Sequence, residues 1–212
     1  MTPTNINTPD YWNQIYQKEW ESGQARSEGY SRDYGPIHDA IIRLIPVDSR
    51  VLDIACGPGL LCRKIKQRLP STQVIGMDFS QYMIARNQER DEPLGIDYRC
   101  MDVQTSLGSL GWKFDVVTMC EILEHLEQPE TVVAAAMGLL KTGGRFILTC
   151  PHDDGIPDPE HVRIWGHDEV FHLLAPYADT VSFRHFPPPW FHVWMLAYLT
   201  KAETINAGED RA

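Results

Sequence analysis

Two hydrophobic patterns alternate along the chain: short continuous apolar runs and longer stretches in which apolar residues recur at helical spacing. The apolar runs are "RVLDIAC", "QVIGMDF", "IDYRCMDV", "KFDVVTMC" and "RFILTCP". The stretches between them are mostly helix-like and roughly 10 to 13 residues long. Continuous apolar strands that alternate with helices are typical of a parallel sheet covered on both faces. The pattern therefore predicts an α/β fold with a doubly wound sheet.

Two helices are predicted before the first strand. "TPDYWNQIYQKEWES" opens with a Thr-Pro-Asp start signal and places Tyr11 and Ile15, with Trp12 and Tyr16, on one face, and "GPIHDAIIRLIP" ends at Pro46. A last helix, "DEVFHLLAPY", precedes the strands "DTVSFRHF" and "WFHVWMLAYLTK", which only "PPP" separates. Because a parallel return needs a long crossover, these two strands are predicted to form an antiparallel hairpin at the sheet edge.

Composition and charge narrow the class of protein. The 212 residues are 43% hydrophobic and 23% charged, which fits a single globular domain. Asp and Glu number 29 against 19 Lys and Arg, so the net charge of -10 disfavours nucleic acid as a partner. The five cysteines lack Cys-x-x-Cys spacing and are expected to be reduced. Neither a membrane-spanning run nor a signal peptide is recognisable, so we expect a cytoplasmic protein without a membrane span.

The turn after the first strand, "VLDIACGPGL", indicates a ligand that the backbone approaches closely. Gly57 and Gly59 lack the side chains that would prevent this approach, and the next helix directs its free N–H groups into the same space. A nucleoside-like ligand is implied. The third glycine of a dinucleotide fingerprint is replaced by Cys62, which weakens the interpretation as an NAD site.

This stretch resembles the first motif of class I S-adenosylmethionine-dependent methyltransferases, approximately D/E-x-G-x-G-x-G. The motif here consists of Asp53, Ala55, Gly57 and Gly59, with Ala55 in place of the usual glycine. "VIGMDFS", "RCMDV", "FDVVTMCEILEHL" and "LLKTGGRFILTCP" match further family motifs in order, so the resemblance covers roughly residues 48–200. It implies a seven-stranded Rossmann-like sheet of order 3-2-1-4-5-7-6 with an antiparallel last strand, and S-adenosyl-L-methionine as cofactor.

The resemblance also assigns cofactor roles. Asp53 would orient the amino group of the cofactor, Asp78 would accept the ribose hydroxyls, and Asp102 would accept from the adenine amine. Phe79 and Met83 would pack on the adenine. The full predicted cofactor set is Asp53, Ala55, Gly57, Gly59, Asp78, Phe79, Met83, Asp102, Val103 and Cys120. Each of these residues taken alone also fits a tight turn, a helix cap or a core position, so the prediction depends on their occurring together.

Candidate catalytic residues follow the fourth strand, in "CEILEHL". Glu121, Glu124 and His125 have i, i+3 and i+4 spacing, so a helical turn would direct all three to one side. His125 is the candidate general base, and a bracing role for these side chains stays open. Together with a later histidine such as His152 or His161 they would also form an oxygen and nitrogen ligand set for a divalent ion. The segment resembles the metal-binding helix of small-RNA 2′-O-methyltransferases and the corresponding segment of ubiquinone-biosynthesis O-methyltransferases; a metal is not favoured.

The long loop "PHDDGIPDPEHVRIWGHDEV" follows the fifth strand. Loops at the carboxyl ends of strands form the ligand crevice of an α/β sheet, so this loop is expected to cover the methyl acceptor. Its candidate substrate residues are His152, His161 and Trp165. A solvated acidic loop is the alternative.

These features predict a methyltransferase that moves a methyl group to an oxygen, or a nitrogen, of a small molecule. Oxygen is favoured because His125 is placed like a base. The alternatives are an RNA 2′-O-methyltransferase with a divalent metal, an NAD-linked oxidoreductase, and a catalytically silent protein that binds S-adenosylmethionine. We expect a helical cap over the cofactor site at 1–46, a methyltransferase core at 47–202, a flexible tail at 203–212, and a monomer or homodimer.

Overall fold

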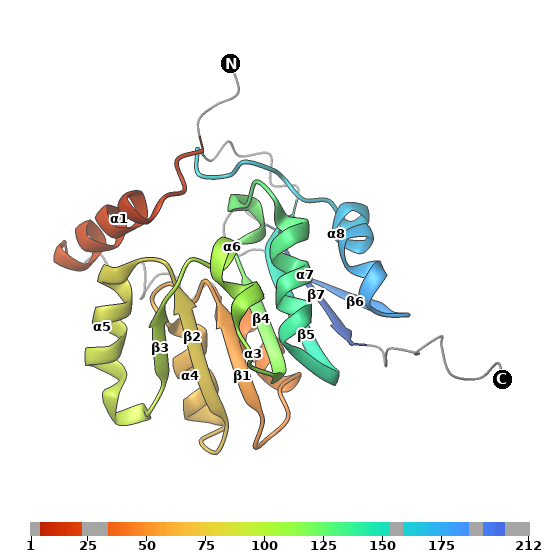
Figure 1. The fold of residues 1–212 in the computed structure, drawn as a ribbon, viewed down its shortest axis with the longest axis horizontal. Coiled ribbons are helices and arrows are strands. Elements are labelled where there is room, and N and C mark those ends of the chain that lie inside the picture. The colour runs from red at the N-terminus through yellow and green to blue at the C-terminus, as the bar shows by residue number, and fades with distance from the viewer. Residues whose placement is uncertain (1–4, 23–33, 153–158, 187–192, 202–212) are drawn as a thin grey trace.

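The computed structural model describes residues 5–22, 34–152, 159–186 and 193–201, and Figure 1 shows its fold. The helices are α1 (Pro9–Glu21), α3 (Gly35–Arg43), α4 (Leu60–Arg68), α5 (Gln81–Asp91), α6 (Val103–Ser106), α7 (Pro129–Leu139) and α8 (His167–Leu174). The strands are β1 (Arg50–Ile54), β2 (Gln73–Asp78), β3 (Asp97–Cys100), β4 (Phe114–Cys120), β5 (Leu140–His152), β6 (Val181–Phe186) and β7 (Val193–Thr200). The predicted tail at 203–212 and the "PPP" link lie outside these residues.

All seven strands belong to one sheet, in the order β3-β2-β1-β4-β5-β7-β6. β1 pairs in parallel with β2 and with β4, and the pairs β2–β3 and β4–β5 are also parallel. β7 is antiparallel to both β5 and β6. The predicted α/β class, strand order and antiparallel hairpin are therefore confirmed.

Local sequence signals fix where the helices begin. The Thr8 hydroxyl accepts the N–H of Tyr11 at 3.2 Å, and Pro9 occupies the first turn of α1. The Ser80 hydroxyl in the same way accepts the N–H of Met83 at 3.1 Å and caps α5. Both caps lie at the carboxyl edge of the sheet and so determine how α1 and α5 approach that edge.

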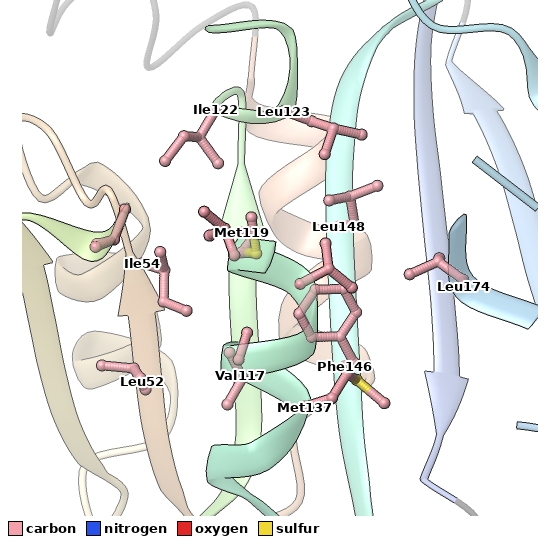
Figure 2. Close-up of a cluster of buried hydrophobic side chains, with 14 of the residues drawn as sticks. Leu52, Ile54, Val117, Met119, Ile122, Leu123, Met137, Phe146, Leu148 and Leu174 are labelled. Carbon is pink, nitrogen blue, oxygen red and sulfur yellow. The ribbon is translucent and has the colours of Figure 1, made fainter. Parts of the chain in front are cut away.

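Successive residues of the central strands face opposite helical layers. Figure 2 shows Leu52, Val117 and Leu148 on the face where α7 contributes Met137 and α8 contributes Leu174. Their neighbours in sequence belong to a second buried cluster, on the face covered by α3 and α4; these neighbours are Val51, Val116 and Ile147. Two buried clusters thus hold the sheet rigid between two layers and position its carboxyl edge.

The predicted helical turn at 121–125 is shorter than expected. The backbone at Glu121 has a φ of 52°, and only Leu123–His125 form a 3-10 turn. A left-handed residue cannot continue a right-handed helix, so Glu121 is separated from the turn that carries Glu124 and His125. β3 and β4 are also joined by the four-residue α6 and a 3-10 turn in place of a long helix.

The two helices before the first strand lie in different places. Figure 1 shows α1 above α5, at the end of the molecule where the parallel strands finish, and α1 contacts α5. α3 instead packs beside α4 and contributes Ile37 and Ile41 to the core. A common cap function for 1–46 stays a prediction, since 23–33 lie outside the described ranges. None of the helices in the described ranges is long and apolar enough to cross a membrane.

Candidate active site

A cavity lies at the carboxyl edge of the sheet, where β1, β2 and β4 end. The residues that line it are Asn7, Trp12, Tyr16, Ala55, Asp78, Phe79, Met101, Asp102, Val103, Gln104, Glu121, Ile122, His125 and Leu126. They come from the N-terminal segment and from the loops after the first four strands. This is the position at which parallel α/β sheets bind ligands. The cavity brings together seven of the predicted site residues: Ala55, Asp78, Phe79, Asp102, Val103, Glu121 and His125.

The glycine turn after β1 is held in a conformation that favours glycine. Ala55, Gly57 and Gly59 have φ values of 57°, 47° and 69°. A side chain at Gly59 would collide with the Tyr98 hydroxyl, and a Cβ at Gly57 would lie 3.0 Å from the Tyr16 hydroxyl oxygen. Neither glycine lines the cavity. Their lack of a side chain instead allows Tyr98 and Tyr16 to pack closely against the turn. Ala55 does line the cavity and carries backbone strain that glycine would avoid.

Asp78 ends β2 and is 4% exposed at the cavity wall. Its Oδ2 accepts the N–H of Gly57 and its Oδ1 accepts the N–H of Ser80, each at 2.9 Å. Burial raises the pKa of this carboxyl to about 6, although both N–H groups stabilise the charged form. Asp78 therefore braces the glycine turn, and each oxygen retains a lone pair for a further donor.

Asp53 lies behind the turn and outside the cavity lining. Its Oδ1 accepts the hydroxyl of Thr118 at 2.6 Å, and its Oδ2 accepts the thiol of Cys62 at 3.2 Å. Burial raises its pKa to about 6 against the effect of these two bonds. The position indicates that Asp53 ties β1 to β4 and α4, whereas its predicted contact with the cofactor stays a prediction.

The side of the cavity after β3 carries the residues predicted to hold adenine. Asp102 caps α6, with Oδ1 accepting the N–H of Gln104 at 2.9 Å. Phe79 and Val103 line the same wall, whereas Met83 is buried and Cys120 lies outside the lining. The helix-cap alternative for Asp102 is thus observed, and it leaves the second carboxylate oxygen available to another donor.

Glu121 faces the cavity from a strained position after β4. Its Oε1 accepts the Thr149 hydroxyl at 2.7 Å, and its Oε2 accepts the Tyr34 hydroxyl at 3.3 Å. The residue keeps a φ of 52°, which costs about 1 kcal/mol or more for a side chain other than glycine. Hydrogen bonds from β5 and from the residue preceding α3 hold this carboxylate in the cavity.

His125 stands at the rim of the cavity between the N-terminal segment and the loop after β5. Its Nδ1 lies 3.0 Å from the backbone oxygen of Glu160, and its Nε2 lies 3.7 Å from Oε1 of Glu124. A carbonyl oxygen only accepts, so Nδ1 carries the proton and Nε2 the lone pair of the neutral ring. The Trp12 ring packs edge-on against His125 with 5.5 Å between ring centroids, and His161 does so with 5.1 Å.

The predicted substrate-loop residues lie in three different environments. Glu124, His125 and His161 each offer a ligating atom within 4.8 Å of the others, a spacing that could hold a metal ion. His152 is more distant, bridged to Trp165 by an isolated β-bridge and close to His185, with ring centroids 5.0 Å apart. Trp165 is 2% exposed and belongs to the hydrophobic core, because the chain there returns to the sheet before α8.

Sequence reasoning did not identify several residues that the structure places in or beside the cavity. Asn7, Tyr34 and Glu160 reach the site only through tertiary contacts, the longest of which spans 153 positions along the chain. Tyr16 had a signal, since it shares the helical face of Tyr11 and Ile15. No local pattern pointed to Asn7, whereas Glu160 belongs to the loop that was expected to cover the methyl acceptor.

A doubly wound sheet, a left-handed glycine turn and buried carboxylates at its carboxyl edge define a nucleoside-binding α/β protein. A family model described as "Methyltransferase domain" matches residues 52–148. The ubiquinone biosynthesis O-methyltransferase of Pseudomonas aeruginosa strain LESB58 is 33% identical over 165 residues, covering 74% of this chain and 69% of that protein. The corresponding enzyme of Idiomarina loihiensis is 34% identical over 124 residues, covering 55% of this chain and 50% of that protein.

Solved structures agree in fold. Magnesium protoporphyrin IX methyltransferase from Synechocystis PCC 6803, solved with bound S-adenosylhomocysteine, has a TM-score of 0.70 at 17% identity, covering 92% of this chain and 98% of that one. The N-methyltransferase NodS from Bradyrhizobium japonicum WM9, also with S-adenosylhomocysteine, has a TM-score of 0.64 at 20% identity, covering 79% and 87%. The chain belongs to the class I S-adenosylmethionine-dependent methyltransferases, and S-adenosylmethionine is its methyl donor.

Proposed function

We propose that the chain transfers the methyl group to a hydroxyl oxygen of a small molecule, with His125 as the general base. The observation that carries this proposal is the position of His125. It lines the same cavity as Asp78 and Asp102, and the Glu160 carbonyl at 3.0 Å from Nδ1 assigns the lone pair to Nε2. The relatives in Pseudomonas and Idiomarina carry the name O-methyltransferase, which supports oxygen as the acceptor atom.

The cofactor would be held by the residues around the glycine turn. Asp78 would accept from the ribose, Asp102 from the adenine amine, and Phe79 with Val103 would pack on the base. Ala55 and the N–H groups after β1 would hold the methionine half. When bound, S-adenosylmethionine supplies a methyl group already activated by a sulfonium leaving group. Positioning of the two reactants then accounts for much of the acceleration.

The proton of the acceptor hydroxyl would move to Nε2 of His125 as the new carbon–oxygen bond forms. The carbon–sulfur bond breaks at the same time, and its electron pair neutralises the sulfonium, so that a methyl ether and S-adenosylhomocysteine result. Glu124 is 2% exposed, and its carboxylate lies 3.7 Å from Nε2, where it stabilises the imidazolium. Glu121, held by Thr149 and Tyr34, would accept a second polar group of the acceptor.

The test is a mass-shift screen of phenols, catechols, carboxylic acids and amines with purified protein and labelled cofactor. Once an acceptor is found, His125→Ala should lower kcat at least a hundredfold and leave the Kd of S-adenosylhomocysteine within about twofold. His172→Ala is the matched control, because His172 is an exposed histidine on α8. Unchanged turnover in His125→Ala would overturn the role of this residue.

A second candidate role for this cluster is the binding of a divalent cation. The ligating atoms of Glu124, His125 and His161 lie within 4.8 Å of one another, and they supply oxygen and nitrogen donors. A cation held there would bind the acceptor oxygen and favour its ionised form. Loss of turnover on chelation, with recovery on adding Mg²⁺ or Zn²⁺, would support this role, whereas full turnover after chelation would exclude it.

We further propose that α1 caps the bound cofactor. The side-chain oxygen Oδ1 of Asn13 accepts the Ser80 hydroxyl at 2.7 Å and the N–H of Tyr82 at 3.1 Å, so α1 is attached to the start of α5. No side chain of α1 is fully buried, which makes the attachment reversible. Saturating S-adenosylhomocysteine should slow tryptic cleavage after Lys18; an unchanged cleavage rate would contradict a cap.

A further inference from the structure

Glu160 joins the N-terminal segment to His125 through both its backbone and its side chain. Its carbonyl oxygen accepts Nδ1–H of His125 at 3.0 Å and Nδ2–H of Asn7 at 2.7 Å. Its Oε1 accepts the hydroxyl of Tyr11 at 2.7 Å. Three donors from two distant segments therefore meet on one loop residue.

The geometry of this group restrains the His125 ring in two ways. The Glu160 carbonyl has two lone pairs, and the donors from Asn7 and His125 engage both. The ring also contacts Trp12, whose indole N–H donates to Oδ1 of Asn7 at 3.1 Å. The side-chain amide of Asn7 therefore makes both bonds: its oxygen accepts from the Trp12 indole, and its nitrogen donates to the Glu160 carbonyl.

The loop that carries Glu160 is fixed to the catalytic turn as well. The N–H of Val162 donates to the backbone oxygen of Glu124 at 2.9 Å. The residues before Glu160, 153–158, lie outside the described ranges. In addition to the His125 ring, the N-terminal segment supplies side-chain donors to Glu160: Asn7 donates to its carbonyl and Tyr11 to its carboxylate.

We propose that Asn7 and Tyr11 are positioning residues that act through Glu160. They hold its carbonyl where it orients His125 and keeps the proton on Nδ1, so that Nε2 presents its lone pair to the acceptor. The contacts of the N-terminal segment with Glu160 therefore orient the catalytic histidine. This inference rests on the proposed function of His125 and extends it to residues that act through Glu160.

Two conservative variants separate the bonds in the group. Tyr11→Phe removes one hydroxyl and keeps the ring that packs at 5.8 Å from Trp12. Asn7→Asp keeps an oxygen for the Trp12 indole but loses the amide donor to the Glu160 carbonyl. Glu160→Gln retains an acceptor for Tyr11, whereas Glu160→Ala does not. Gln17→Ala is the control, since Gln17 lies on α1 and bonds only to exposed Glu21 among the contacts described.

The first readout is steady-state kinetics with the acceptor found in the screen. Tyr11→Phe, Asn7→Asp and Glu160→Ala should each lower kcat about three- to tenfold, the effect of one lost hydrogen bond, with KM for S-adenosylmethionine within twofold. Gln17→Ala should retain wild-type kcat, and Glu160→Gln should be faster than Glu160→Ala, because it keeps an acceptor for Tyr11. A Tyr11→Phe/Glu160→Ala double variant should be no slower than the slower single variant, because both changes remove the same bond.

The second readout needs no acceptor. Long-range ¹H–¹⁵N correlation of the imidazole at pH 8.5, with S-adenosylhomocysteine bound, reports which ring nitrogen carries the proton. Wild type should give the Nδ1–H form, and Tyr11→Phe and Asn7→Asp should give a mixture of the two forms. If wild type is already a mixture, or if both variants match it in tautomer and kcat while His125→Ala is inactive, the positioning role is overturned. Wild-type turnover in His125→Ala would instead overturn the proposed function itself.

Discussion

The affinity for S-adenosylhomocysteine should fall when the pH is lowered from 7 to 5. Asp78 is 4% exposed at the cavity wall, and burial raises its pKa to about 6. In the ionised form each oxygen can accept a ribose hydroxyl in addition to the N–H of Gly57 or Ser80. The protonated form uses one oxygen as a donor, so the ligand should bind the ionised form preferentially.

The magnitude follows from the populations of the two forms. With a pKa of about 6, Asp78 is about 90% ionised at pH 7 and about 10% ionised at pH 5. If only the ionised form binds, Kd at pH 5 should be about ten times Kd at pH 7. Linkage fixes the direction of this change in affinity. A ligand that prefers the ionised carboxylate lowers its pKa, so the ligand binds more weakly as the pH falls through the pKa of the free protein.

Titration calorimetry on two variants locates the group responsible. Asp78→Asn should bind more weakly than wild type at pH 7 and should lose most of the pH dependence. Asp97→Asn, an exposed carboxylate on the neighbouring strand β3, should retain the wild-type behaviour. Equal Kd values at the two pH values would refute the reasoning. A full tenfold change that persists in Asp78→Asn would assign the titration to another group, with Asp53 examined next.

Three further predictions concern stability. Ala55→Gly should raise Tm and stabilise the protein by about 0.5 kcal/mol. The reason is that relief of the left-handed backbone strain at φ 57° outweighs the greater conformational entropy that glycine gives the unfolded chain. A lower Tm would contradict strain at this position. Phe146→Ala should lower the free energy of unfolding, measured in urea, by about 3–5 kcal/mol, because Phe146 is 0% exposed. Phe171 is 41% exposed, so Phe171→Ala should lower it by less than about 1 kcal/mol. Equal losses in the two variants would refute the described core. The folded pKa of Asp53, about 6, exceeds its ordinary value of 3.8, so the stability from its protonation is full below pH 3.8 and is lost as the pH rises through about 6. Relative to Asp53→Asn, wild type should therefore lose about 1 kcal/mol of stability between pH 5 and 7. A constant difference between the two proteins would count against a raised pKa.

The sheet and its order were accessible to sequence reasoning because the signals that define them are local or match family motifs. Continuous apolar runs predicted the buried strands, and the short link before the last strand predicted its antiparallel pairing. Glu121 shows the limit of such reasoning. Its i, i+3, i+4 relation to Glu124 and His125 fitted one helical turn. In the structure Glu121 has a left-handed backbone that separates it from that turn, and its carboxylate accepts hydrogen bonds from Thr149 and Tyr34.

The candidate site was only partly predictable for a related reason. Motif positions located Asp78, Asp102 and His125 beside the cavity, because they lie at or shortly after the carboxyl ends of β2, β3 and β4. Glu160 follows no strand directly, and its role depends on Asn7, 153 positions away. Trp165 was expected in the substrate loop and lies in the core, since an aromatic residue in a loop sequence fits either place.

Features that cost stability are concentrated at the carboxyl edge of the sheet. Ala55 and Glu121 have left-handed backbones, and Asp53 and Asp78 are buried carboxyls whose pKa burial raises to about 6. A sequence selected for stability alone would favour glycine at the first two positions and neutral side chains at the other two. The edge therefore holds its carboxylates in place before any ligand arrives, and the two buried clusters beneath it supply the stability that permits this arrangement. Preorganised acceptors of this kind suit a transfer reaction in which much of the acceleration comes from positioning.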